Sequence, residues 1–234
     1  MSAYYDVDPG DKVHPGDPVV VDRYTTSARI NHWITAVCLI LLAISGLSLF
    51  HPRLFFLTEL FGGGANTRVI HPWLGILVLF GFYGLFFRFW RACLIVRDDL
   101  AWLLSVRDLL AGREDKVPEV GRYNPGQKMF FWGMAALIII LLGSGLVIWD
   151  QYFLPYTSVD EKRIAILVHS VAAVIAICAV IIHVSMVIWE RGTLRAMTRG
   201  HVTGGWAWKH HRKWLRELVT GKPSDQDTSA TPAQ

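Results

Sequence analysis

The sequence predicts an all-α integral membrane protein organised as a four-helix bundle. The prediction rests on four apolar stretches, each about as long as a helix needs to cross a hydrocarbon core of about 30 Å. These stretches run over 30–50, 69–89, 129–149 and 164–189. The composition agrees with a membrane protein, since 53% of the 234 residues are hydrophobic and the chain holds ten Trp and twelve Phe residues.

The first stretch, 30–50, follows an amino-terminal arm, 1–29, that is mostly polar and contains several Asp and Pro residues. A secretory signal peptide would instead place a charged region directly before a short apolar region, with a small-residue cleavage site after it. We therefore expect the first stretch to be retained as a membrane helix.

The charged residues predict the orientation of the helices. Eight Lys and Arg residues lie in 88–128 and eight more in the tail 190–234, whereas the other two connections carry only two each. Since positive residues gather on the cytoplasmic side, both chain ends and the loop 90–128 are expected in the cytoplasm. The chain is then expected to be a multi-pass membrane protein. The same bias accounts for the isoelectric point near 9.1, so no nucleic-acid partner is expected.

Two histidines in the fourth stretch carry the main functional signal. His169 and His183 lie fourteen residues apart, so on a helix they share one face within about 40° and stand roughly 21 Å apart along the axis. With alternating helix directions, His71 opens the second helix at the level of His169, on the outer side. His32 lies near the cytoplasmic end of the first helix, at the level of His183. The sequence thus predicts two histidine pairs, each built from two helices.

A buried titratable group in a membrane is costly and indicates a functional site. A single membrane histidine can also serve as a hydrogen-bonding group between helices, and this alternative stays open for each histidine taken singly. A closed zinc site needs four ligands around one point, which two separate levels cannot supply. Heme iron takes axial histidines, and helix bundles build such sites in their cores. The pairs therefore predict two hemes. The three cysteines, Cys38, Cys93 and Cys178, show no CxxCH spacing, which excludes covalent attachment.

Small residues accompany the predicted outer pair. Gly46 and Gly145 fall near the level of His71 and His169, and Gly75 lies one turn from His71. Glycine would let a flat ring approach the backbone, although plain helix packing uses glycine equally well. Both Gly46 and Gly145 stand in a Ser-Gly-Leu triplet, a short hint of an internal two-fold relation.

The middle loop contains two further features. The segment 99–110 has helical apolar spacing with charges on the other face, which predicts an amphipathic helix on the cytoplasmic surface. The turn Asn124-Pro125-Gly126, followed by Gln127, then leads into the third membrane helix. It is either ordinary turn chemistry or a polar rim for a lipid-soluble substrate at the inner site. In the basic tail, His201, His210 and His211 are expected on a solvated or partner-docking face.

These residues resemble the gamma subunit, cytochrome b556, of respiratory membrane-bound formate dehydrogenases, over about 23–216. The resembling motifs are RxxHW at 29–33, SGLSLF at 45–50, RVIHPWLGI at 68–76, VGRYNPGQKMFFW at 120–132, SGLVIW at 144–149 and the histidine pair of the fourth helix. The resemblance implies a diheme cytochrome b domain over 30–189 in the bacterial inner membrane, with non-covalent b hemes. Its axial ligands would be His71 and His169 for the outer heme, and His32 and His183 for the inner heme.

The resemblance also implies a quinone pocket beside the inner heme. Its residues would be Asn124, Gly126 and His183, and the amide of Gln127 adds to the same polar rim. The substrate would be menaquinone or ubiquinone. No residue of this chain is expected to oxidise formate.

The implied partners are an iron–sulfur beta subunit and an alpha subunit with a molybdenum or tungsten pterin, and the heterotrimer could assemble further. Electrons would pass from the outer to the inner heme and reduce quinone near the cytoplasm. Two other functions stay open: a similar cytochrome b subunit serving another donor, such as hydrogenase or thiosulfate reductase, and a heme-free anchor or metal carrier.

Overall fold

The computed structural model describes residues 11–16, 18–113 and 117–221. Parts of the expected arm 1–29, loop 90–128 and tail 190–234 therefore lie outside the described residues. The elements in chain order are β1 (Val13–His14), β2 (Val20–Asp22), α1 (Thr26–Phe50), η1 (Pro52–Phe61), α2 (Gly64–Phe89), α3 (Arg97–Leu104), α4 (Val106–Leu110), α5 (Pro125–Ile148), α6 (Asp150–Phe153), η3 (Leu154–Tyr156), α7 (Val159–Trp189), α8 (Thr193–Arg199), β3 (His201–Thr203), α9 (Gly204–His210) and α10 (Arg212–Thr220).

Four helices, α1, α2, α5 and α7, are long and apolar enough to cross a membrane, so the four predicted stretches are confirmed as helices. Each begins four or five residues before the predicted apolar stretch, because polar residues form its first turn. The start of α5 shows why. Pro125 takes the first helical position, where its missing N–H costs nothing, and Asn124 precedes it as the cap.

The chain divides into two compact units. The bundle unit comprises 30–88 and 130–186, and the terminal unit comprises 1–29, 89–129 and 187–234. The bundle unit therefore holds most of each long helix. The terminal unit gathers both chain ends and the connection between α2 and α5.

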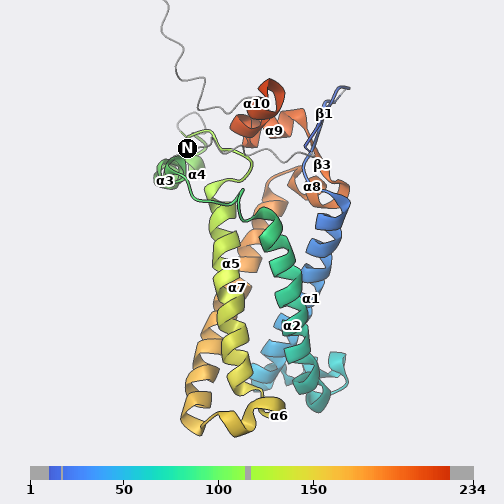
Figure 1. Ribbon diagram of the computed structural model, residues 1–234, viewed down its shortest axis with the longest axis vertical. Helices are drawn as coiled ribbons and strands as arrows, with labels where there is room; N and C mark the ends of the chain where they lie inside the picture. The colour runs from blue at the N-terminus through green and yellow to red at the C-terminus, as the bar shows by residue number, and fades with distance from the viewer. Residues whose placement is uncertain (1–10, 17, 114–116, 222–234) are drawn as a thin grey trace, which may run out of the picture. The chain divides into compact units, whose positions relative to one another are not determined.

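The bundle unit packs its four long helices side by side (Figure 1). Its core is a layer formed by Val78, Met134, Ile138 and Ala176, with partly buried apolar neighbours around it. Large apolar side chains such as Phe80 instead point outward and are 71% exposed, as expected for a surface that meets lipid tails. The interior is thus closed by small and medium side chains, and the outer surface is apolar.

The terminal unit contains a small antiparallel sheet of order β1-β2-β3. Val13 pairs with Val21, and Val21 pairs with Val202, so the amino-terminal arm and the carboxy-terminal tail share one sheet. The indole rings of Trp206 and Trp214 pack beneath it. The mostly helical prediction holds for the chain, but this sheet was not predicted, since strands of two or three residues leave no periodic pattern.

The predicted helix over 99–110 is interrupted. α3 ends at Leu104 and α4 starts at Val106, with Ser105 between them. Ser105 Oγ donates to the Trp102 carbonyl oxygen, a local bond that competes with helix continuation. Asp99 is buried rather than solvated, because it forms an ion pair with Lys128. The position of these two helices on a membrane surface stays a prediction.

Candidate functional site

The predicted outer pair comes together in the bundle unit. The ring centroids of His71, on α2, and His169, on α7, lie 6.2 Å apart, with their planes at 67°. An imidazole nitrogen binds a metal ion at about 2 Å, so two imidazoles on opposite sides of one ion have ring centres about 6 Å apart. The observed separation therefore fits two axial ligands of a single metal centre.

Two serines hold these imidazoles from the remaining two helices. Ser45 Oγ, on α1, lies 2.8 Å from His71 Nδ1, and Ser144 Oγ, on α5, lies 2.9 Å from His169 Nδ1. Both serines are buried, at 0% and 8% exposure. All four long helices thus contribute one polar side chain each to the same level of the bundle.

The glycines that follow these serines leave room for the two imidazole rings. A methyl group added at Gly46 would lie 3.1 Å from His71 Cε1, and one added at Gly145 would lie 3.4 Å from His169 Cε1. The ring that approaches each glycine is therefore the imidazole itself. Gly75 is different, because a methyl group there would meet Leu42 at 3.9 Å, an ordinary helix-packing contact.

The predicted inner pair has other surroundings. His183 stacks on Phe130 with ring centroids 4.4 Å apart and planes at 11°. The His32 ring contacts the edge of Trp33, with ring centroids 5.5 Å apart. His32 Nδ1 is buried and has no hydrogen-bond partner among the described residues. An orphaned imidazole in an apolar interior suits a group that binds from outside the chain.

The two pairs are separated by the apolar layer of the bundle. Val78 follows His71 by seven residues, and Ala176 lies midway between His169 and His183 on α7. The inward face of α7 also carries the buried Ala172, so it offers only small side chains between its two histidines. This face leaves room for planar groups beside the histidines without breaking the apolar core.

The loop motif forms the cap of α5 within the terminal unit. The backbone N–H of Gln127 donates to Asn124 Oδ1 at 2.8 Å, and the backbone N–H of Asn124 donates to Gln127 Oε1 at 3.0 Å. This reciprocal pair is a capping box. A methyl group at Gly126 would press on Asn124 Oδ1 at 3.3 Å, so glycine keeps the cap open. Ordinary turn chemistry therefore accounts for the amide oxygens, while the NH₂ groups of Asn124 and Gln127 are left as donors among the described residues.

The expected quinone pocket joins residues of both units. Asn124, Gly126 and Gln127 come together at the start of α5, and His183 belongs to the bundle unit. Because each unit is described by itself, the approach of Asn124 to His183 stays a prediction.

Residues 23–200 match the family described as prokaryotic cytochrome b561. The cytochrome b556(fdo) subunit of formate dehydrogenase from Escherichia coli strain K12 is 42% identical over 196 residues, which cover 84% of this chain and 92% of the relative. The chain belongs to this family of b-type cytochromes. The cytochrome b556 subunit of the nitrate-inducible formate dehydrogenase of the same strain is 40% identical over 190 residues, covering 81% and 88%. That of the Haemophilus influenzae formate dehydrogenase is 37% identical over 211 residues, covering 90% and 89%.

In this cytochrome the loop before α5 is held by residues far away in the chain. Arg23 Nη2 donates to the Arg122 carbonyl at 2.6 Å, and Arg122 Nη2 donates to the Arg23 carbonyl at 2.6 Å. Arg122 also forms a buried ion pair with Asp11. Arg23 is only 3% exposed, and its guanidinium lies 4.9 Å from the Trp214 ring centre. The amino-terminal arm and α10 thereby fix the loop backbone, which the sequence alone did not indicate.

The expected solvated or docking role is wrong for His211. Its side chain is 1% exposed, with Nδ1 bonded to the Gly121 carbonyl at 2.7 Å and Nε2 3.3 Å from Arg23 Nη2. Since arginine only donates, Nε2 must accept and the ring is neutral. Burial, followed by the charge of Arg23, lowers the pKa of His211 well below its ordinary value. His211 is therefore a structural clamp on the loop that precedes Asn124.

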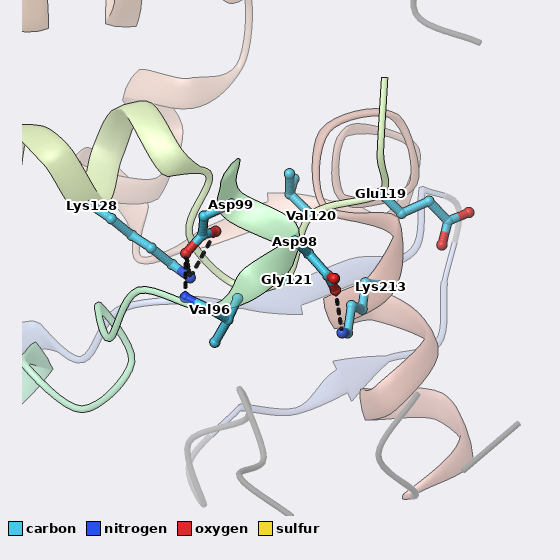
Figure 2. A pocket seen from close by; sticks show the side chains of 8 residues that line it. All are labelled: Val96, Asp98, Asp99, Glu119, Val120, Gly121, Lys128 and Lys213. Carbon is cyan, nitrogen blue, oxygen red and sulfur yellow. Dashed lines mark hydrogen bonds and ion pairs between the residues drawn. The ribbon is translucent and has the colours of Figure 1, made fainter. Parts of the chain in front are cut away.

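The loop also borders a small pocket of about 30 Å³ in the terminal unit (Figure 2). Figure 2 shows Lys128 bridging both oxygens of Asp99, and Asp98 paired with Lys213. This volume holds about one water molecule and is far too small for a quinone ring. In this cytochrome the two ion pairs of the pocket lining join α3 to α5 and to α10.

Proposed function

We propose that the chain is the diheme cytochrome b membrane subunit of a formate dehydrogenase complex. It would pass electrons from an iron–sulfur subunit across the membrane to reduce quinone near the cytoplasmic side. The observation that carries the proposal is the His71–His169 pair, with its 6.2 Å separation and its two serine partners. The three relatives described above, which are cytochrome b556 subunits of formate dehydrogenases, support the choice of complex.

The proposed ligands are His71 and His169 for an outer heme b, and His32 and His183 for an inner heme b. Heme b supplies reversible one-electron transfer when bound, and the protein supplies ligands, orientation and field. Each of the four histidines lies on a long helix of the bundle and would offer one ring nitrogen to a heme iron. The apolar layer around Val78 and Ala176 keeps water and protons out of the interval between the levels. The orientation with both chain ends in the cytoplasm belongs to the proposal and rests on the Lys and Arg distribution.

The proposed quinone site uses Asn124, Gly126, Gln127 and His183. The capping box occupies the amide oxygens, so the groups available to a quinone carbonyl are the NH₂ donors of Asn124 and Gln127. A quinone carbonyl would gain from such donors, because the capping box already orders both side chains and little further side-chain entropy is lost on binding. Protons taken up at this end would come from the cytoplasm, so the reaction would add to the proton-motive force.

The function is tested on the complex purified with its partner subunits. We expect two non-covalent hemes per chain by acid–acetone extraction, a b-type reduced-minus-oxidised spectrum, and reduction of both hemes by formate without a mediator. One heme per chain would contradict the pairing. Reduction by hydrogen or another donor, with formate inactive, would contradict the assignment to formate dehydrogenase and favour a cytochrome b for that donor.

Asn124 offers a test of the quinone site that separates capping from binding. Asn124→Asp keeps the oxygen that caps α5 and removes the NH₂ donor, whereas Asn124→Ala removes both. Losing a hydrogen bond of about 1 to 1.5 kcal/mol should weaken quinone binding roughly 5- to 15-fold in both variants. The quinone KM and the steady-state reduction level of the hemes are the measurements, and both should rise.

Stability provides the control for this pair of variants. Only Asn124→Ala should also destabilise the protein, by about 1 kcal/mol, because only it loses the cap. Gln127→Glu is the matched variant at the other end of the capping box, since it too keeps the acceptor and loses the NH₂ group. If Asn124→Asp leaves quinone kinetics unchanged, the loop is a helix cap and nothing more.

A further inference from the structure

The hydroxyls of Ser45, on α1, and Ser144, on α5, make the same pattern of contacts. Ser45 Oγ donates to the Leu42 carbonyl oxygen at 3.0 Å, and Ser144 Oγ donates to the Ile140 carbonyl oxygen at 2.7 Å. Each Oγ also lies within 2.9 Å of a histidine Nδ1. A serine hydroxyl therefore links a helix backbone to an imidazole in both halves of the bundle.

Counting donors and acceptors determines what the imidazoles do. A hydroxyl has one proton, and in both serines a backbone carbonyl lies within donating distance. When the carbonyl takes that proton, each Oγ accepts from a protonated Nδ1 of His71 or His169. The neutral ring with a proton on Nδ1 has its lone pair on Nε2, which is the nitrogen free to bind a metal.

The inner pair is held differently. His183 packs face to face on Phe130, and His32 Nδ1 has no hydrogen-bond partner within the described part of the chain. A phenyl ring can orient an imidazole but cannot accept a strong hydrogen bond from it. The two levels thus differ in their second layer of contacts, although both present two histidines.

We propose that Ser45 and Ser144 are positioning residues for the outer heme, which select the Nε2-binding tautomer of His71 and His169 and lower that heme's reduction potential relative to the inner one. This inference rests on the proposed heme ligation. A partner that accepts the Nδ1 proton makes the ligand more basic. A more basic ligand stabilises the oxidised, more positive iron. The outer heme thereby becomes the better electron donor of the two, which favours transfer toward the quinone end.

The test uses redox titration and EPR spectroscopy of the purified complex, neither of which depends on turnover. Ser45→Ala and Ser144→Ala should each raise the outer heme's potential, so that its reduced-to-oxidised ratio at a fixed poise rises about two- to tenfold. The ferric EPR signal of that heme should also change, because it depends on the angle between the two imidazole planes. Ser144→Thr keeps a hydroxyl that can bond the same carbonyl, and it should restore the wild-type values.

Two other serines serve as matched controls. Ser48 is 1% exposed and donates to the Ser45 carbonyl at 2.7 Å, and Ser170, beside His169, donates to the Ile166 carbonyl at 2.7 Å. Among residues 11–16, 18–113 and 117–221, neither hydroxyl forms a hydrogen bond with a histidine, so Ser48→Ala and Ser170→Ala should leave both potentials and both EPR signals unchanged.

The outcomes separate this inference from the proposed function. Two bound hemes with an outer signal that is unchanged in Ser45→Ala and Ser144→Ala overturn the role of the serines and leave the function standing. A shift of the inner heme alone, or an equal shift in Ser48→Ala, overturns it as well. A wild-type protein without a heme ligated by His71 and His169 overturns both the function and the inference.

Discussion

Replacing His71 or His169 with Ala is expected to remove the outer heme and leave the inner one, so that heme content falls from two to one per chain. The two imidazole rings come within 6.2 Å of each other from α2 and α7, and one alone could not supply both of the proposed ligands. Loss of a supporting contact to a metal ligand typically costs 10- to 100-fold in affinity or activity, so loss of the ligand itself should cost more than about 100-fold. Formate-to-quinone electron transfer should fall accordingly.

His51 provides the matched control for these substitutions. It lies in the bundle unit, but its Nδ1 accepts from the Arg53 backbone N–H and caps the 3₁₀ helix η1. His51→Ala should keep both hemes. Extraction of heme and resolution of the two redox waves give the result. If His71→Ala or His169→Ala removes the inner wave and keeps the outer one, the pairing of levels is wrong.

Lys128→Met is expected to destabilise the terminal unit by about 3 to 5 kcal/mol, because it strands a buried carboxylate. Lys128 Nζ lies 3.1 and 3.0 Å from the two oxygens of Asp99, and the side chains are 5% and 9% exposed. Asp99 also accepts the Val96 backbone N–H at 2.8 Å, so it cannot turn away without breaking the start of α3. Lys128 directly follows the capping box, and the quinone KM should therefore rise in the same variant. Denaturant unfolding in detergent measures the stability.

Two comparisons isolate the buried pair. Asp99→Asn combined with Lys128→Met removes the stranded charge and should recover most of the stability. Lys213→Met disrupts the Lys213–Asp98 pair, which is 3.5 Å long with side chains 21% and 64% exposed, and should cost no more than about 1 kcal/mol. If Lys128→Met and Lys213→Met lower the free energy of unfolding equally, the burial of the Lys128–Asp99 pair makes no difference to stability.

Much of the bundle could be predicted because a membrane helix is specified by the residues of one contiguous stretch. A stretch of apolar residues must satisfy its backbone within itself, so α1, α2, α5 and α7 are visible in the sequence as uninterrupted runs. Alternation of direction between consecutive helices then assigns a depth to every residue. This reasoning matched His71 with His169, and the structure brings their rings within 6.2 Å of each other.

Some residues were recognised in the sequence, but their contacts could not be predicted from it. The two Ser-Gly-Leu triplets suggested an internal repeat, but only the structure showed that each serine bonds a histidine on another helix. The turn at Asn124 was recognised, yet its reciprocal bonds with Gln127 depend on backbone geometry at the start of α5. The partner of each serine was decided by the approach of two helices, whereas the partner of Asn124 was decided by the local backbone geometry of the first turn of α5.

The four long apolar helices and the approach of His71 to His169 could thus be predicted without a structure, because hydrophobic length and helical spacing are properties of contiguous residues. The terminal unit could not be predicted in this way. Its strands are two or three residues long, and its clamp joins Arg23, Arg122 and His211 across 99 and 188 positions of the chain. Burial of such charged and titratable side chains is favourable only when all partners meet at once. No local sequence pattern indicates these long-range contacts, so the arm and the tail were predicted as two separate polar segments.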